Sequence, residues 1–142
     1  MGIRLDTPIG QAEMEKVVAL HKPHLIILDP FKKIISASPN DSDAVLAATD
    51  FLDKIIYQYG VSIWINHHTR KSHVSQGSVV DLGAQEMSGL YHLAQWVDSI
   101  IQLVPVAPDK VRLEFELRHA EDIVKPINLA LDRTKAGFVV VP

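Results

Sequence analysis

Cysteine is absent from the 142 residues, which excludes disulfide bonds and thiolate metal sites and favours a reducing compartment. Long apolar runs are absent as well: none approaches the roughly 18 residues that a membrane-spanning helix needs. The opening stretch, MGIRLDTPIG, has no apolar core of signal-peptide length. We therefore expect a cytoplasmic protein without a membrane partner.

An excess of charge of either sign is also missing. Fourteen basic and seventeen acidic side chains give a formal net charge of -3, so the overall charge does not indicate binding to nucleic acid. A local basic patch is compatible with this balance. Hydrophobic residues make up 47% and charged residues 22%, an ordinary globular balance. The length suits one core, and we expect residues 1–142 to form a single domain.

The first half of the chain has the pattern of a parallel α/β fold. A short strand and turn are expected in IRLDTPIG, followed by a helix in QAEMEKVVALHKP. HLIILDP and VSIWIN are apolar runs of strand length, typical of strands covered on both faces. Between them NDSDAVLAATDFLDKIIYQYG predicts a helix that starts at an Asp or Ser cap and stops at Gly60. Its expected buried stripe consists of Val45, Ala48, Leu52, Ile55, Ile56 and Tyr59.

The pattern changes after residue 71. KSHVSQGSVVDLG predicts a loop, and AQEMSGLYHLAQW predicts a short helix. Four strand-like runs follow, VDSIIQLVPV, KVRLEFELR, PINLALD and GFVVV, separated by short turns. The predicted fold class is therefore α/β, a parallel sheet with flanking helices that runs into a C-terminal antiparallel meander.

Polar side chains follow both central strands. Asp29 ends the first strand, and the pair His67 and His68 ends the second. Ligands of open parallel sheets bind at the carboxyl ends of the strands, so these groups are expected in one crevice. A lone carboxylate suits a hydrated magnesium ion, a histidine could contact a terminal phosphate, and Arg70 and Lys71 add positive charge.

Other interpretations of these residues stay open. Asp29–Pro30 is also the composition of a simple strand-ending turn, and HHTRK could be a solvated strand end. A zinc or iron site from Asp29, His67 and His68 is a third interpretation, but neighbouring residues of an extended strand point to opposite faces. The remaining histidines have no ligand spacing and are interpreted as surface or packing residues: His21, His24, His73 and His92.

Taken together, HLIILDPF, the acidic NDSDAV helix start and VSIWINHHTRK resemble the RecA-fold ATPases of the RepA-like hexameric replicative helicase family. The resemblance spans most of residues 12 to 141. It implies a RecA-like sheet in which Asp29–Pro30 is the Walker B element, with Asp29 holding magnesium through water. It also implies that His67, with His68 beside it, senses the terminal phosphate of ATP.

The resemblance extends to the second half of the chain. It implies that Arg118 reaches the nucleotide of a neighbouring subunit in a ring, which makes a homo-oligomer the expected assembly. Arg133 and Lys135 are alternatives for this role, although DRTKAG equally predicts a hairpin turn. Single-stranded DNA is the implied partner. The residues expected to face it are Lys71, His73, Gln76 and Ser78.

A phosphate-binding loop is missing from this chain. Such a loop has the pattern G-x-x-x-x-G-K-[ST], and none of the seven glycines is followed by lysine. The family's P-loop segment and catalytic glutamate are expected upstream of residue 12, so the chain resembles the C-terminal part of such an ATPase. ATP and magnesium are expected in the complete protein, and no cofactor is firmly expected for this chain alone, which we expect to be inactive. The alternatives are a non-catalytic assembly or DNA-binding module and a metal-dependent hydrolase.

Overall fold

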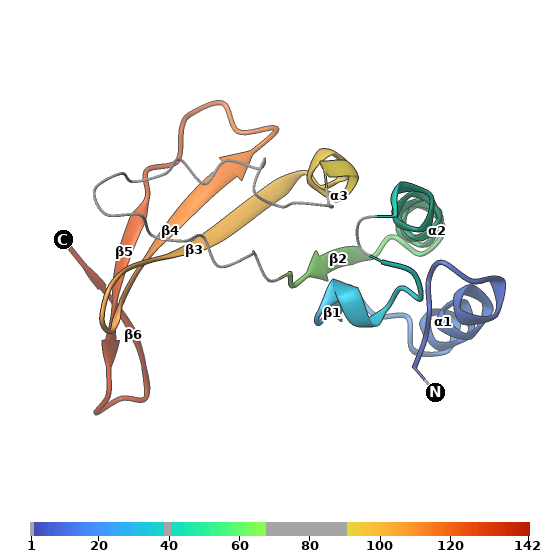
Figure 1. The fold of residues 1–142 in the computed structure, drawn as a ribbon, viewed down its shortest axis with the longest axis horizontal. Helices are drawn as coiled ribbons and strands as arrows, with labels where there is room; N and C mark the ends of the chain where they lie inside the picture. The colour runs from blue at the N-terminus through green and yellow to red at the C-terminus, as the bar shows by residue number, and fades with distance from the viewer. Residues whose placement is uncertain (1, 39–40, 68–90) are drawn as a thin grey trace. The chain divides into compact units, whose positions relative to one another are not determined.

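The computed structural model describes residues 2–38, 41–67 and 91–142 (Figure 1). Its contacts divide the chain into two compact units, Met1–Trp96 and Val97–Pro142. The first contains helices and a parallel pair of strands, and the second contains an antiparallel sheet. This order confirms the predicted α/β class with a C-terminal meander. Whether both units fold as the expected single domain stays a prediction, and each unit is described on its own below.

The first unit alternates helices with short strands. Its elements are α1 (Pro8–His21), β1 (Leu25–Leu28), the 3-10 helix η1 (Phe31–Lys33), α2 (Ser42–Tyr59), β2 (Ser62–Ile65) and α3 (Tyr91–Trp96). β1 and β2 pair in parallel, and α2 lies between them in the chain. The predicted helix–strand–helix–strand order is thus found.

Local sequence signals determine where α2 begins and ends. The Asp41 side chain accepts hydrogen bonds from the backbone N–H groups of Asp43 and Ala44, which have no partner inside the helix. Gly60 ends the helix with φ at 63°, a left-handed conformation that glycine adopts without steric cost. Four residues of the predicted stripe are buried, while Ile56 and Tyr59 are half-buried. The four buried members are Val45, Ala48, Leu52 and Ile55.

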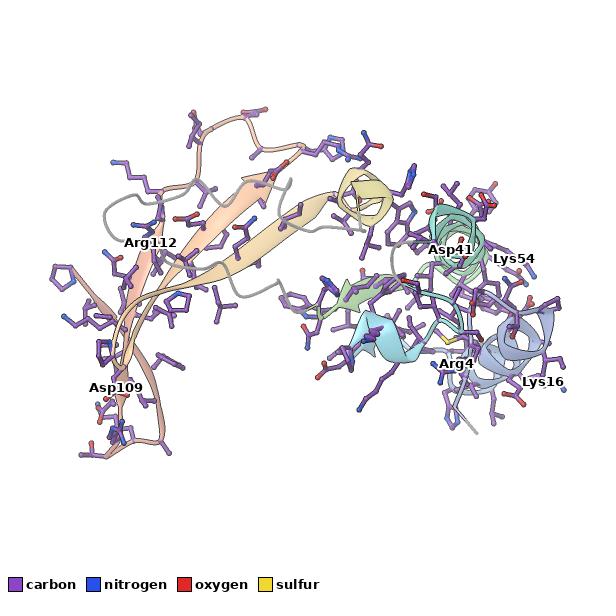
Figure 2. The ribbon with its side chains drawn as sticks, viewed as in Figure 1. Arg4, Lys16, Asp41, Lys54, Asp109 and Arg112 are labelled. Carbon is purple, nitrogen blue, oxygen red and sulfur yellow. The ribbon has the colours of Figure 1, made fainter. Side chains whose placement is uncertain are left out.

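The core of the described residues lies in the first unit. Its buried apolar side chains come from all three helices, from β1 and from the segments beside them. The largest fully buried side chains are Phe31, Leu5, Ile35, Leu52, Ile55, Val18 and Val45. An ion pair of 2.7 Å between Lys54 Nζ and Glu15 Oε2 also joins α2 to α1 at the surface, and Figure 2 labels Lys54 on α2.

One face of the parallel pair packs on this core and the other does not. Ile26 and Ile63 contact the core, whereas Leu25, Ile27 and Trp64 are 49%, 61% and 48% exposed. We call these three residues the open face. From the apolar runs we expected both faces of the two strands to be covered. Among the described residues, the helices cover only one face of the pair. Alternation along a strand separates the two sets of side chains.

The segment before α1 forms no strand, so the strand expected in IRLDTPIG is wrong. Instead, Arg4, Leu5 and Asp6 form what we call the N-terminal clasp, which binds the last residue of η1 and the chain that follows it. Leu5 N donates to Ile34 O at 2.7 Å, and Arg4 Nη1 donates to the carbonyls of Lys33 and, at 2.9 Å, Ile35. Figure 2 labels Arg4 in this region.

The Asp6 carboxylate completes the clasp. It accepts the backbone N–H of Ser36 at 2.8 Å and that of Ala37 at 3.0 Å. Partial burial by itself would raise the pKa of Asp6, but these hydrogen bonds favour the charged form and hold the pKa below its ordinary value. Gly10 lets α1 approach, because a Cβ there would lie 2.0 Å from the Arg4 carbonyl oxygen.

The second unit is a meander with the strand order β3-β4-β5-β6. Its strands are β3 (Ser99–Ala107), β4 (Lys110–Leu117), β5 (Ile127–Asp132) and β6 (Gly137–Val141), and all neighbours are antiparallel. Every residue from 97 to 142 is described, and none of them is buried. Leu103, Phe138 and Val140 are 64%, 51% and 73% exposed. The sheet therefore has no dry core within its own unit.

We predict that Asp6→Asn lowers the free energy of unfolding by about 1 kcal/mol at neutral pH, because the clasp loses a charged acceptor. The pKa of Asp6 in the folded chain lies below its ordinary value of 3.8. Its contribution is therefore present above that value and is lost as the pH falls through the folded-state pKa. Urea denaturation should separate the two proteins at neutral pH and bring them together at an acid pH below the folded-state pKa of Asp6.

The matched control is Asp50→Asn, which makes the same chemical change at an exposed position of α2. It should leave the unfolding curve unchanged at both pH values. Equal stability of the wild type and Asp6→Asn at neutral pH would contradict the role assigned to the clasp.

Candidate functional site

The two predicted strand ends meet at one edge of the parallel pair. β1 and β2 are in register from Leu25 opposite Ser62 to Leu28 opposite Ile65. Asp29 follows β1, and Asn66 and His67 follow β2, so all three emerge at the same end. We call Asp29, Asn66 and His67 the carboxyl edge. This is the end at which parallel sheets bind their ligands.

Backbone hydrogen bonds continue the pairing beyond the strands. Asn66 N donates to Leu28 O at 2.9 Å, and Phe31 N donates to Asn66 O at 3.0 Å. Asn66 is therefore held on both of its backbone polar groups by the chain on either side of Asp29. The Asp29–Pro30 peptide bond between these two contacts is cis.

Asn66 is a polar residue of this edge that the sequence interpretation passed over in favour of the histidines. Its side-chain Oδ1 accepts a hydrogen bond of 2.7 Å from Trp64 Nε1. Asn66 and His67 are half-buried, and Asp29 is exposed. The available signal was its position: Asn66 is the first polar residue after the apolar run VSIWI.

The carboxyl edge offers groups of the kind that a magnesium–phosphate ligand requires. Asp29 is an exposed carboxylate, and magnesium in nucleotide sites uses one or two carboxylates together with waters and phosphate oxygens. Lys32 and Lys33 are exposed cations of η1, the short helix that directly follows Asp29–Pro30. The residues present thus fit the metal side of such a ligand, whereas the phosphate cradle is missing from the sequence.

Several predicted residues lie outside the described part of the chain. These are His68, Arg70, Lys71, His73, Gln76 and Ser78. The second sensor histidine, the added positive charge and the DNA-facing set therefore stay predictions. Within the described residues, no group of three or more histidine, cysteine, aspartate or glutamate side chains is arranged to hold a metal ion. The alternative zinc or iron site includes His68 and is not tested by this statement.

The first part of the chain is similar to a known family. Residues 5–74, just under half of the chain, match the family model described as AAA domain. This stretch resembles a nucleotide-binding ATPase domain. The AAA-like stretch contains Leu5 and Asp6 of the N-terminal clasp, both parallel strands and the carboxyl edge. No curated protein matches the chain.

The AAA-like stretch supports the general part of the sequence interpretation, namely an ATPase-like domain with ATP and magnesium as plausible ligands. The finer resemblance to RepA-like hexameric helicases stays a prediction. No helix in the described ranges is long and apolar enough to cross a membrane.

Arg118 lies in the second unit, directly after β4. Its backbone N donates to Asp98 O at 3.0 Å, and its side chain is exposed. The neighbouring His119 Nε2 lies 3.5 Å from Asp98 Oδ1. These contacts place Arg118 at the end of the β3–β4 pair, and its predicted action on a neighbouring subunit stays a prediction.

The alternatives Arg133 and Lys135 take part in turns of the meander. Arg133 Nη2 lies 2.8 Å and 2.9 Å from the two carboxylate oxygens of Asp109, which Figure 2 labels at the β3–β4 turn. Lys135 Nζ lies 3.9 Å from Asp132 Oδ2, and the Asp132 carboxylate also accepts from Thr134. The hairpin-turn interpretation of DRTKAG is therefore found in the structure.

We predict that the Arg133–Asp109 pair stabilises the meander, by no more than about 1 kcal/mol because both side chains are exposed. A double-mutant cycle with Arg133→Ala and Asp109→Asn should show a favourable coupling energy that shrinks as salt is added. Lys125→Ala removes another exposed cation and serves as the control. Strictly additive effects of the two substitutions would show that this contact is unimportant in solution.

Proposed function

We propose that this chain carries the magnesium- and phosphate-sensing part of a RecA-like ATPase that couples ATP hydrolysis to binding of, or movement along, single-stranded DNA. The observation that carries the proposal is the carboxyl edge: the register of β1 and β2 brings Asp29 together with Asn66 and His67. That edge lies inside the stretch that matches an AAA domain. The resemblance of the sequence to RepA-like helicases supports the finer assignment to a replicative helicase.

In this proposal Asp29 and His67 of the edge have distinct tasks. Asp29 holds a water of the hydrated magnesium ion, for which its exposed carboxylate is suited. His67, with His68 beside it, contacts the terminal phosphate and responds to its loss. Arg70 and Lys71 add positive charge. Magnesium, when bound, neutralises charge that develops on the phosphates.

The missing phosphate-binding loop determines what the chain does alone. Backbone N–H groups of a glycine-rich loop and its lysine supply most of the hold on the β- and γ-phosphates. Because none of the seven glycines precedes a lysine, that hold must come from another stretch of polypeptide. The isolated chain is then a binding surface for one side of the nucleotide and is inactive as an enzyme.

Two further parts of the proposal concern other molecules. Arg118 stabilises negative charge on the nucleotide of a neighbouring subunit, as an exposed arginine at the end of a strand can do. The residues proposed to face single-stranded DNA are Lys71, His73, Gln76 and Ser78. The task of Arg118 requires a neighbouring copy of the chain, so a homo-oligomer is part of the proposal.

A second function is favoured by the same missing loop. A module that keeps the α/β fold without catalysis, and serves assembly or DNA binding, needs no phosphate cradle. The two proposals differ at the carboxyl edge, because a module without catalysis has no use for a magnesium-dependent contact at Asp29.

We predict that the isolated chain binds Mg-ATP more weakly than micromolar and releases no phosphate, since the cradle is absent. Asp29→Asn should weaken this binding further and remove its dependence on magnesium. Isothermal titration calorimetry with and without magnesium measures both effects, and Asp50→Asn on α2 is the control. Micromolar affinity, or unchanged magnesium dependence in Asp29→Asn, would overturn the proposed role of the edge.

We also predict that the chain associates with itself through the open face. Exposed apolar sheet surfaces tend to associate, and Ile27, at 61%, is the most exposed of the three residues of the open face. Analytical ultracentrifugation should find dimers or larger assemblies that dissociate when Ile27 is replaced by threonine. Tyr57→Ser, at a side chain that is 94% exposed on α2, is the control. A monomeric wild type at high concentration would contradict this prediction.

A further inference from the structure

The two outer strands of the meander differ in chemistry. Within residues 97–142, β3 pairs only with β4, and β6 pairs only with β5. Alternate residues of an outer strand direct their backbone N–H and C=O groups away from the sheet, where the strand of another chain can pair with them. Natural sheets commonly block such an edge with proline, with charged side chains or with a β-bulge.

β3 carries two of these blocking features. Pro105 has no N–H to donate to a further strand, and the register with β4 shifts between Pro105 and Ala107. A strand that approached β3 from outside would therefore lose the regular ladder at this point. We call β3 the blocked edge of the meander.

β6 carries none of them. Its sequence, GFVVV, contains neither proline nor a charged residue, and its register with β5 is unbroken over all five residues. Valine and phenylalanine favour extended strands. Phe138 and Val140 are 51% and 73% exposed, so this strand presents apolar side chains together with its outward backbone groups. We call β6 the unblocked edge.

We propose that the unblocked edge is an interaction site whose partner is β6 of a second copy of the chain, paired in antiparallel orientation about a two-fold axis. An antiparallel pair of identical strands is complementary to itself, because each outward N–H of one copy meets a carbonyl of the other. No charged side chains meet across the pair. The pairing joins two four-stranded meanders into one eight-stranded sheet, and it does not depend on the proposed nucleotide site.

The residues on either side of β6 determine the register of this pair. Ala136 has a left-handed backbone with φ at 50°, which does not continue a strand, and Pro142 has no N–H. Pairing over the full length of Gly137–Val141 places Val139 opposite Val139 of the second copy. It also places Phe138 opposite Val140 of the second copy, and aromatic and β-branched pairs of this kind stabilise a sheet.

The difference between the two edges limits the size of the assembly. The pair uses the unblocked edge of both copies, and the edges that remain outside are blocked, so the sheet closes as a dimer and does not extend into a fibre. Only the five residues of β6 take part on each side. Interfaces of this size are small, and we expect a dimer with a Kd that is roughly micromolar or weaker.

The first experiment is analytical ultracentrifugation of the full chain with Ile27→Thr, which removes association through the open face and leaves the edge contact to be measured alone. This protein should show a monomer–dimer equilibrium without larger species. Adding Val139→Lys places two lysines opposite each other and should raise the Kd by at least about tenfold. The matched control is Val106→Lys, the same change at a 47% exposed residue of the blocked edge, which should leave the Kd unchanged.

A charge exchange separates loss of the contact from loss of the fold. Val139→Glu should weaken the dimer as Val139→Lys does, but an equimolar mixture of the two should form a heterodimer, because lysine then lies opposite glutamate. Variants that fail to fold would not be restored by mixing. Ala130, the residue opposite Val139 on β5, is small, so the longer side chains fit without displacing the meander.

Amide hydrogen exchange locates the contact. In the monomer only alternate N–H groups of β6 are bonded to β5, whereas in the dimer the remaining outward N–H groups are bonded as well and should exchange slowly. These outward groups should exchange rapidly again in Val139→Lys.

Four results would overturn the proposal. They are a monomeric Ile27→Thr protein at millimolar concentration, assemblies larger than a dimer, equal Kd values for the Val139→Lys and Val106→Lys variants, and a dimer in which the outward N–H groups of β6 still exchange rapidly.

Discussion

The parallel register of β1 and β2 is the constraint on which the carboxyl edge depends. With Leu28 opposite Ile65, the next step of the ladder brings Asn66 across from Asp29. A shift of one residue would exchange the two faces of a strand, so that Trp64 would turn toward the core and Ile63 toward solvent. The chemistry available to a ligand at this edge therefore follows from how two four-residue strands pair.

Packing on one side of the sheet holds that register. Ile26 and Ile63 contact a core built by α1, α2 and the segments around them, and the N-terminal clasp fastens the chain that follows Asp29–Pro30. Apolar contacts with the core thus hold the two strands, and hydrogen bonds from the segment after η1 to Asp6 and Leu5 hold the chain that follows the carboxyl edge. The described helices leave the open face uncovered, and the proposed self-association uses this face.

The proposed function divides one chemical task between this chain and another stretch of polypeptide. The carboxyl edge offers a carboxylate, a carboxamide and an imidazole, which suit the metal and the terminal phosphate. The stronger grip of a glycine-rich loop is not encoded here. The AAA-like stretch includes the whole edge.

Local signals in the sequence were enough to predict the Asp41 cap and Gly60 stop of α2, the two apolar strands, the meander, and Asp29 and His67 as strand-end residues. Which residues contact one another became known only from the folded chain. The strand expected before α1 became a clasp because Leu5 and Asp6 bond to the chain some thirty residues away. Asn66 and the Arg133–Asp109 pair were likewise settled by long-range contacts. Periodicity and capping act over a few residues, whereas register and hydrogen bonds between distant segments depend on how the packed core brings those segments together.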